Sequence, residues 1–261
     1  MGESRRAVLA RWAISVGLCA CAMALAGAAA ASSAYERQLT RQFGAIAFTA
    51  EIGGEHRRGR LIRWTGPIRA QIFEGEAYRD EVLPVLAQLS RMTGVPITTP
   101  ADYSGVNLEI RIVPRGVYRD IAGAGIDEPC LTLVDSYPAT GAIAWASVVI
   151  QSDDPYLRRH CIVEELTQAM GLMDDSTVFA RSVFNDRSRA TQLTLEDRIM
   201  LALLYDRRLS PNMPRDLAMR LAPQIIGDLR RRASARARAA AGVDAAHPAA
   251  QASATTSSRP Q

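Results

Sequence analysis

Up to residue 150 the chain consists mainly of short runs typical of strands, with one helical stripe among them, and from residue 155 onward apolar residues recur at helical spacing. The short runs predict strands, at residues 59–64, 67–73, 106–113, 130–134 and 143–150. Helical stripes of apolar residues stand at residues 80–94, 155–170, 194–204 and 214–229. This order predicts an α+β or α/β fold, in which a mixed sheet carries a helix packed on one face and the C-terminal part is helical.

The N-terminus has the pattern of an export signal. Three arginines form a positive region ahead of an uncharged apolar stretch at residues 12–26, and small residues suitable for cleavage end at Ala34. We therefore interpret residues 1–34 as a signal peptide, so the remaining protein is expected in the periplasm or outside the cell. Two adjacent arginines also fit the twin-arginine pattern. A lipoprotein site at Cys21 and an uncleaved anchor are further alternatives, and the export route stays open.

The rest of the chain divides into one domain and a tail. Residues 35–229 contain the predicted strands and helices, and their number suits a single domain. Residues 230–261 are rich in arginine and alanine and have almost no bulky apolar side chains. Because such a segment cannot bury enough surface to offset its ordering entropy, we expect the tail to be disordered.

Charge and motif content exclude several classes of function. The net charge is only +4, and all 31 basic residues are arginine, which reflects genomic base composition more than a nucleic-acid partner. The chain has neither a glycine-rich phosphate loop nor a G-x-S-x-G nucleophile elbow, which argues against nucleotide chemistry and the common serine hydrolases. Once the signal is removed, we expect no nucleic-acid partner and no stable membrane span.

Two cysteines remain after removal of the signal, Cys130 and Cys161. Outside the reducing cytoplasm two such thiols usually pair. The bridge would close a loop of about thirty residues and contribute roughly 3 to 4 kcal/mol. Two separate buried thiols are the alternative. A catalytic cysteine is disfavoured, because His160 and Cys161 are neighbours on a helix and point about 100° apart.

The helix predicted at residues 155–170 carries the candidate chemistry. Its apolar residues gather on one arc, whereas Glu164, Glu165 and Gln168 gather on the opposite arc. Glu164 and Gln168 stand one above the other because they are four residues apart. An ordinary surface helix has the same two-sided pattern. His160 lies near the edge of the polar arc and is expected to be solvated, although its spacing of four from Glu164 also suits a pair of ligands.

The second half of this helix and the residues after it can be aligned with a zinc-protease motif. The metzincin pattern H-E-x-x-H-x-x-G-x-x-H overlays Glu164, Glu165, Gln168, Gly171 and Asp174, and only Glu165 and Gly171 agree with it. No cofactor is expected beyond a possible divalent metal. The all-oxygen set Glu164, Gln168 and Asp174 suits a hard cation such as calcium or magnesium. With a metal bound, Glu165 is the natural general base for attack on a carbonyl.

Several runs of residues resemble the bacterial family called domain of unknown function 2927. They are CIVEELTQAMGL, SVFND and LTLEDRIMLALLYD, with RWTGPIRAQI and WASVVI before them, and they span roughly residues 55–215. The resemblance implies an exported, zincin-like domain with a degenerate zinc motif. It also implies that the missing histidines are a trait of the family, and it supplies no substrate.

Three classes of function follow from these patterns. The first is a non-catalytic scaffold, a pseudoenzyme, that binds a peptide or an envelope protein in a cleft beside strand 143–150, which we expect at the sheet edge. The second is an atypical metal-dependent peptidase or hydrolase with Glu165 as general base. The third is an envelope adaptor that acts through the basic tail, residues 230–261. The sequence does not predict an oligomeric state.

Overall fold

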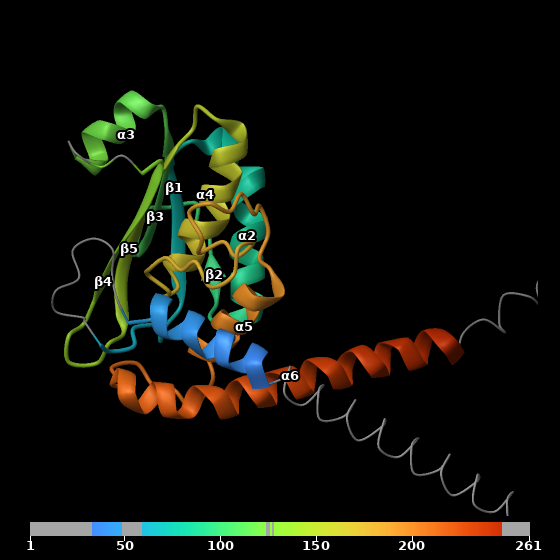
Figure 1. The fold of residues 1–261 in the computed structure, drawn as a ribbon. Coiled ribbons are helices and arrows are strands. Elements are labelled where there is room, and N and C mark those ends of the chain that lie inside the picture. Colours follow the sequence, from blue (N-terminus) through green and yellow to red (C-terminus); the bar gives the residue numbers. More distant parts are fainter. Residues whose placement is uncertain (1–32, 49–58, 124–125, 127, 247–261) are drawn as a thin grey trace, which may run out of the picture.

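The computed structural model describes residues 33–48, 59–123, 126 and 128–246 (Figure 1). Residues 1–32 of the proposed signal peptide, with its export features, lie outside the described residues, and so does the tail from residue 247 onward. Within the described ranges, no helix combines the length and the apolar character needed to cross a membrane.

Five strands form one mixed sheet in the order β2-β1-β3-β5-β4. The four strands β2, β1, β3 and β5 run parallel, and β4 pairs antiparallel with β5 at one edge. The strands are β1 (Ile68–Glu74), β2 (Ile97–Thr98), β3 (Leu108–Val113), β4 (Cys130–Ser136) and β5 (Ile143–Gln151). The predicted class, a mixed sheet with helices, is confirmed.

The edge strand beside the helices is β4, so the assignment of the edge to residues 143–150 is wrong. β5 is hydrogen-bonded on both sides, by β3 and by β4. Most of β5 is buried on both faces, as is usual for an inner strand. In β4, by contrast, Leu133 and Asp135 are exposed. The predicted strand at 59–64 is also absent, because isolated bridges alone join Arg60 to Pro214 and Arg63 to Ala142 within the described residues.

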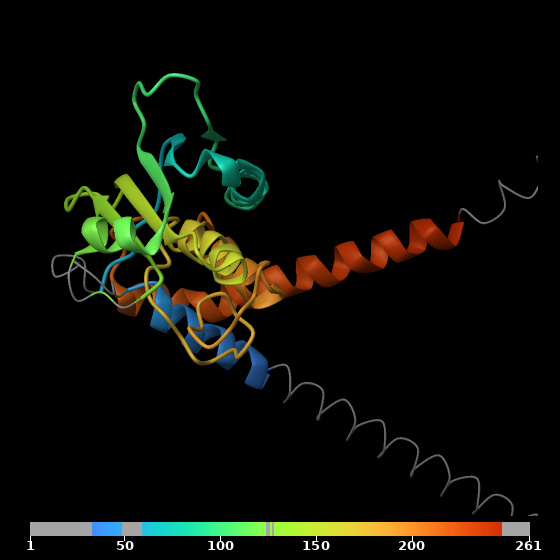
Figure 2. The same ribbon diagram turned by 90° about the horizontal axis from the view of Figure 1, so that it is seen from above.

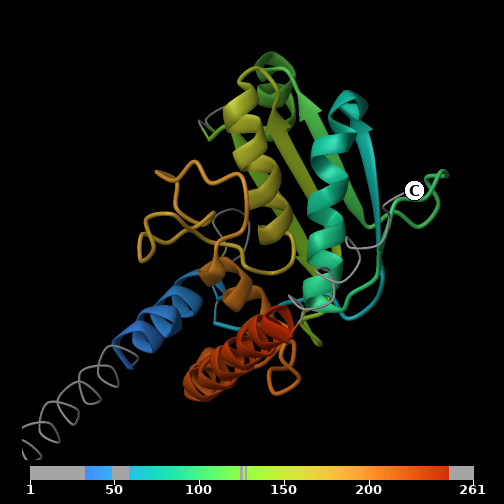
Figure 3. The same cartoon turned by 90° about the vertical axis from the view of Figure 1, so that its right-hand side faces the viewer.

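Helices α2 (Arg79–Thr93) and α4 (Pro155–Gln168) pack side by side on one face of the sheet (Figures 1 and 3). The predicted apolar stripe of α2 faces the core, where its buried residues are Val82, Val85, Leu86 and Leu89. On the other face lies α3 (Arg115–Ala122), a helix that the sequence does not predict. Within α3 only Tyr118 is buried. The segment therefore lacks the repeated apolar positions from which a helix is predicted.

Both ends of α4 are held by specific contacts. Asp154 caps the first turn, where its carboxylate accepts hydrogen bonds from the backbone N–H groups of Tyr156 and Leu157. Past the last turn, Gly171 has φ 112°, and an added Cβ would lie 2.3 Å from the carbonyl oxygen of Ile62. The indole of Trp64 donates to the carbonyl of Ala169 at 2.8 Å. The end of α4 is therefore anchored to the segment that precedes β1.

The remaining helices pack below the sheet and α4 (Figure 1). They are a helix at residues 33–46, α5 (Leu195–Leu204) and α6 (Arg215–Ala246). The capping box predicted at 194–197 is present, with Thr194 and Asp197 as its partners. α6 continues to Ala246, which differs from the disorder expected from residue 230 onward. Alanine and arginine have high intrinsic helix propensity, so the helix continues beyond the packed body without a core to bury.

Candidate functional site

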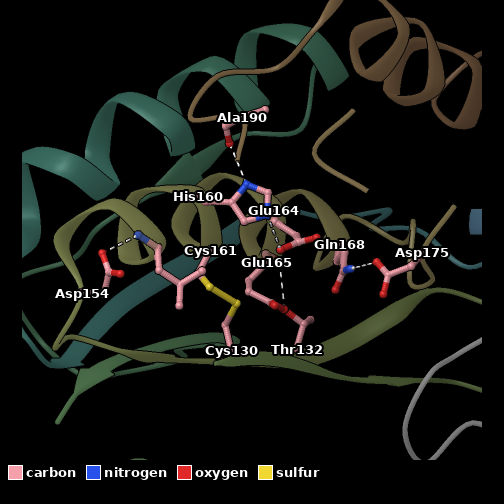
Figure 4. The surroundings of a disulfide bond; sticks show 11 residues. Cys130, Thr132, Asp154, His160, Cys161, Glu164, Glu165, Gln168, Asp175 and Ala190 are labelled. Atoms are coloured by element: carbon pink, nitrogen blue, oxygen red, sulfur yellow. Dashed lines mark hydrogen bonds and ion pairs between the residues drawn. A yellow bond between two sulfur atoms is a disulfide. The ribbon is translucent and has the colours of Figure 1, made fainter. Parts of the chain in front are cut away.

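A pocket of about 330 Å³ opens where α4 meets the start of β4. Five carboxylate side chains and one imidazole line it, together with both cysteines. The carboxylates are Glu128, Glu164, Glu165, Asp175 and Asp186, and the imidazole is that of His160. Four of these groups, those of His160, Cys161, Glu164 and Glu165, come from α4 (Figure 4). The pocket is therefore strongly acidic and lies beside the sheet edge.

The polar arc of α4 is buried between β4 and the irregular segment at residues 169–194, which contact Glu165 and His160 respectively. Relative exposure is 3% for His160, 7% for Glu164, 4% for Glu165 and 5% for Gln168. The expectation of a solvated His160 is wrong, and an ordinary surface helix is excluded. One arc of α4 packs in the core and the other lines the pocket.

The predicted disulfide joins Cys130 at the start of β4 to Cys161 of α4. The two Cα atoms are 6.0 Å apart, within the usual range for a bridge, and 31 positions separate the residues in sequence. The bridge forms part of the pocket wall. It holds the edge strand against the helix that carries the polar groups.

His160 and Glu164 share a proton. Nδ1 of His160 lies 2.8 Å from the carbonyl oxygen of Ala190, so Nδ1 must carry a hydrogen and donate it. Nε2 lies 3.1 Å from Oε2 of Glu164, a contact that is favourable only when a proton lies between the two atoms. Burial lowers the pKa of His160, but the hydrogen bond and charge of Glu164 and the Ala190 carbonyl outweigh it and raise that pKa above 6.5.

Glu165 is fixed to the edge strand. The hydroxyl of Thr132 lies 2.6 Å from Oε2 of Glu165 and 3.0 Å from the backbone carbonyl of the same residue. A hydroxyl has one hydrogen to donate, and the shorter distance assigns it to the carboxylate. Charge-assisted bonds of this kind satisfy a buried carboxylate. Glu165 is therefore oriented within the pocket by β4.

The structure brings together two of the three proposed metal ligands. Glu164 and Gln168 line the same pocket, whereas Asp174 is not among the lining residues. Gln168 donates from Nε2 to Asp175 at 3.4 Å. Asp174 accepts the backbone N–H of Asp175 at 2.8 Å, as expected for a residue in that loop. Because Asp174 is not among the residues that line the pocket, we derive no chemical step through a metal held by all three residues.

A family model described as "Protein of unknown function (DUF2927)" matches residues 36–224. The chain belongs to this family. The matched range contains every element from β1 to α5, so the whole lining of the acidic pocket lies within the DUF2927 region. No curated protein matches the chain.

Sequence reasoning missed several groups at this DUF2927 pocket. Thr132 is two residues beyond Cys130 in an alternating strand, so its side chain shares a face with the cysteine. Once that cysteine is paired with the helix, this alternation is a signal that places Thr132 against α4. No periodic pattern marks Glu128, Asp175 or Asp186, which lie in irregular segments.

Proposed function

We propose that this exported DUF2927 protein binds an extended peptide segment in the cell envelope without cleaving it. The peptide pairs with the outward backbone groups of Cys130 and Thr132 in β4 and inserts a cationic side chain into the acidic pocket. The observation that carries the proposal is the position of this pocket, directly beside backbone groups of an edge strand that point away from the sheet.

The hydrogen-bond pattern of β4 identifies those backbone groups. Gln151 donates its N–H to the carbonyl of Pro129 at 2.9 Å, one step beyond the opposed pair Cys130 and Ile150. Opposed residues in an antiparallel ladder alternate between hydrogen-bonded and non-hydrogen-bonded pairs. Cys130 and Thr132 therefore direct their N–H and C=O groups away from β5. A peptide strand can pair with these groups by strand addition.

The charge of the pocket specifies which side chain it accepts. Five carboxylates line it, and the one basic lining group, His160, shares its proton with Glu164. An arginine or lysine side chain is attracted to such a site, whereas an acidic side chain is repelled. Side chains of an added strand alternate between the two faces of the sheet. Every second side chain of the bound peptide therefore points toward α4 and the pocket.

Isothermal titration with extended peptides that differ at one central position tests this function. A central arginine is expected to bind at least about tenfold more tightly than glutamate at the same position, and added salt to weaken the binding. The variant Glu128→Gln/Asp186→Asn removes two pocket charges and is expected to reduce this preference. Glu76→Gln, outside the pocket, is the matched control. The proposal would be contradicted if the affinity did not depend on peptide charge, or if it were unchanged after N-methylation of the peptide backbone.

We infer in addition that the scaffold is zincin-like with a degenerate zinc motif. Support comes from the order in which a strand, the helix α2, further strands, the antiparallel edge strand β4 and the inner strand β5 precede α4. Glu165 in α4 and Gly171 after it stand at the matching motif positions. The triple substitution Glu164→His/Gln168→His/Asp174→His rebuilds the motif. If the scaffold is zincin-like, the variant acquires a stoichiometric zinc ion; a folded variant that binds none would count against the relationship.

A metal-dependent hydrolase is the second candidate function. It is favoured by one observation, the orientation of Glu165 in the pocket by Thr132. A peptide-cleavage screen followed by mass spectrometry separates the two functions. Turnover that disappears in Glu165→Gln, while peptide binding persists, would replace the binding proposal with the catalytic one.

A further inference from the structure

Three side chains that can ligate a metal meet in the wall of the pocket. The Sγ atoms of Cys130 and Cys161 and a carboxylate oxygen of Glu164 all lie within 4.8 Å of one another. All three residues are buried and line the pocket (Figure 4). Thiolates ligate metals, and a disulfide holds no thiolate. We propose that, after reduction of the bridge, Cys130, Cys161 and Glu164 bind one zinc-class divalent ion.

The geometry needs only local side-chain movement. Zinc lies about 2.3 Å from thiolate sulfur and about 2.1 Å from carboxylate oxygen, so donors in a tetrahedral site are roughly 3.5 to 3.8 Å apart. The three donors already lie within 4.8 Å of one another, on β4 and α4. Opening the bridge separates the sulfurs, and rotation of Glu164 closes the remaining gap. The backbones of both elements stay in place.

His160 supplies the support that a carboxylate ligand requires. Its Nε2 lies 3.1 Å from Oε2 of Glu164, and its Nδ1 lies 2.8 Å from the carbonyl oxygen of Ala190. The ring is therefore held by the backbone and in turn holds the carboxylate. Outer partners of this kind orient metal ligands, and their loss typically costs tenfold to a hundredfold in affinity.

The donor set selects the class of ion. Two thiolates and one carboxylate suit a borderline-soft ion such as zinc, whereas calcium and magnesium take oxygen donors. Three protein ligands leave a fourth position that faces the pocket, open to water or to a ligand. This set differs from the all-oxygen set Glu164, Gln168 and Asp174 and shares only Glu164 with it.

A dithiol is the reductant that opens the bridge between Cys130 and Cys161. The dithiol transfers two electrons and two protons to the bridge, the S–S bond breaks, two thiols form, and the dithiol becomes a disulfide. Binding of the ion then releases both thiol protons, because thiolate is the ligating form. Exchange with an oxidised dithiol reverses both steps. The pocket thus has two states, one with the bridge and one with the ion.

Titration of the full mature chain with Co²⁺ tests the inference, because cobalt reports thiolate ligation through a charge-transfer absorption band. Protein reduced by a phosphine is expected to bind one Co²⁺ per chain, and Zn²⁺ to displace it. Oxidised protein is expected to show no such band. Circular dichroism of the reduced protein establishes that the fold persists.

Substitutions that retain both cysteines distinguish an ordered site from binding by free thiols. Glu164→Gln is expected to weaken Co²⁺ binding by at least about tenfold, and His160→Gln by about tenfold. Glu76→Gln, which removes a carboxylate outside the pocket, is the control and is expected to have no effect. The proposal is overturned if reduced protein, folded or not, binds no Co²⁺. Equal binding by the oxidised protein or by Glu164→Gln would overturn it as well.

Discussion

Two adjacent carboxylates of α4 are satisfied by different partners. Glu164 faces His160 of the same helix, and Glu165 faces Thr132 of β4. The first contact raises the pKa of His160 through the hydrogen bond and charge of Glu164, so it couples the pocket to pH. The second contact crosses between two elements, so it couples the helix to the sheet edge.

The contact between His160 and Glu164 predicts a stability that declines with rising pH. The folded pKa of His160 is raised above 6.5, so its contribution is fully present below that value and is lost as pH rises through the folded pKa. In thermal unfolding between about pH 6 and pH 9, the melting temperature of the wild type should exceed that of His160→Gln by an amount that decreases as the pH rises. A difference between the two proteins that is constant over this range would contradict the shared proton.

The contact between Thr132 and Glu165 predicts a measurable loss when the hydroxyl is removed. Thr132→Val keeps the shape but removes the 2.6 Å hydrogen bond to a buried carboxylate, which is expected to lower the free energy of unfolding by about 1 to 3 kcal/mol. Urea denaturation measures the loss. Thr167→Val is the matched control, since Thr167 is also buried but donates only to a helix carbonyl, that of Val163. Equal losses in both variants would contradict a specific role for Thr132.

At the scale of elements, α4 is the part that sequence predicts best, because its cues are local. Pro155 in the first turn, a period of 3.6 and Gly171 past the end define it without knowledge of the fold. Local cues do not identify the edge strand, since β4 and β5 are both apolar and similar in length. Only the long-range pairing of β5 with β3 places β4 at the edge. The pocket shows the same division. Helical spacing places Glu164, Glu165 and Gln168 on one arc of α4, whereas the burial of His160 and the positions of the loop groups depend on long-range packing.

The bridge between β4 and α4 is the covalent link between these two elements. Removing it in Cys130→Ala/Cys161→Ala is expected to lower the free energy of unfolding by about 3 to 4 kcal/mol, because the unfolded chain regains the entropy of a closed loop. Urea denaturation measures this change. Wild-type protein kept reduced, without metal, should show a similar loss. A change below about 1 kcal/mol would mean that the bridge adds no stability to the fold.

The whole molecule consists of a packed body and a helix that projects from it (Figures 1 and 2). The helix at 33–46 and α6 are tied to the body and to each other by side-chain contacts. The hydroxyl of Tyr35 donates to Glu196 at 2.7 Å, and Arg230 pairs with Glu36 at 2.7 Å. Residues 231–239 are exposed. The packing of α6 therefore ends near Arg230, and beyond the pair of Arg231 with Asp228 the side chains of Arg232, Arg236 and Arg238 are exposed.

This division predicts that the end of the chain is dispensable for folding. Residues 233–239 are exposed, so deleting residues 233–261 should change the free energy of unfolding by less than about 0.5 kcal/mol. Deletion from Asp228 onward is the matched comparison, since it also removes the pairs of Asp228 with Arg208 and of Arg230 with Glu36. Partly exposed pairs contribute up to about 1 kcal/mol each, so this variant should unfold at lower urea concentration. Because the shorter deletion leaves the body intact, loss of its association with envelope fractions would support the adaptor function, and unchanged association would exclude a role for this segment.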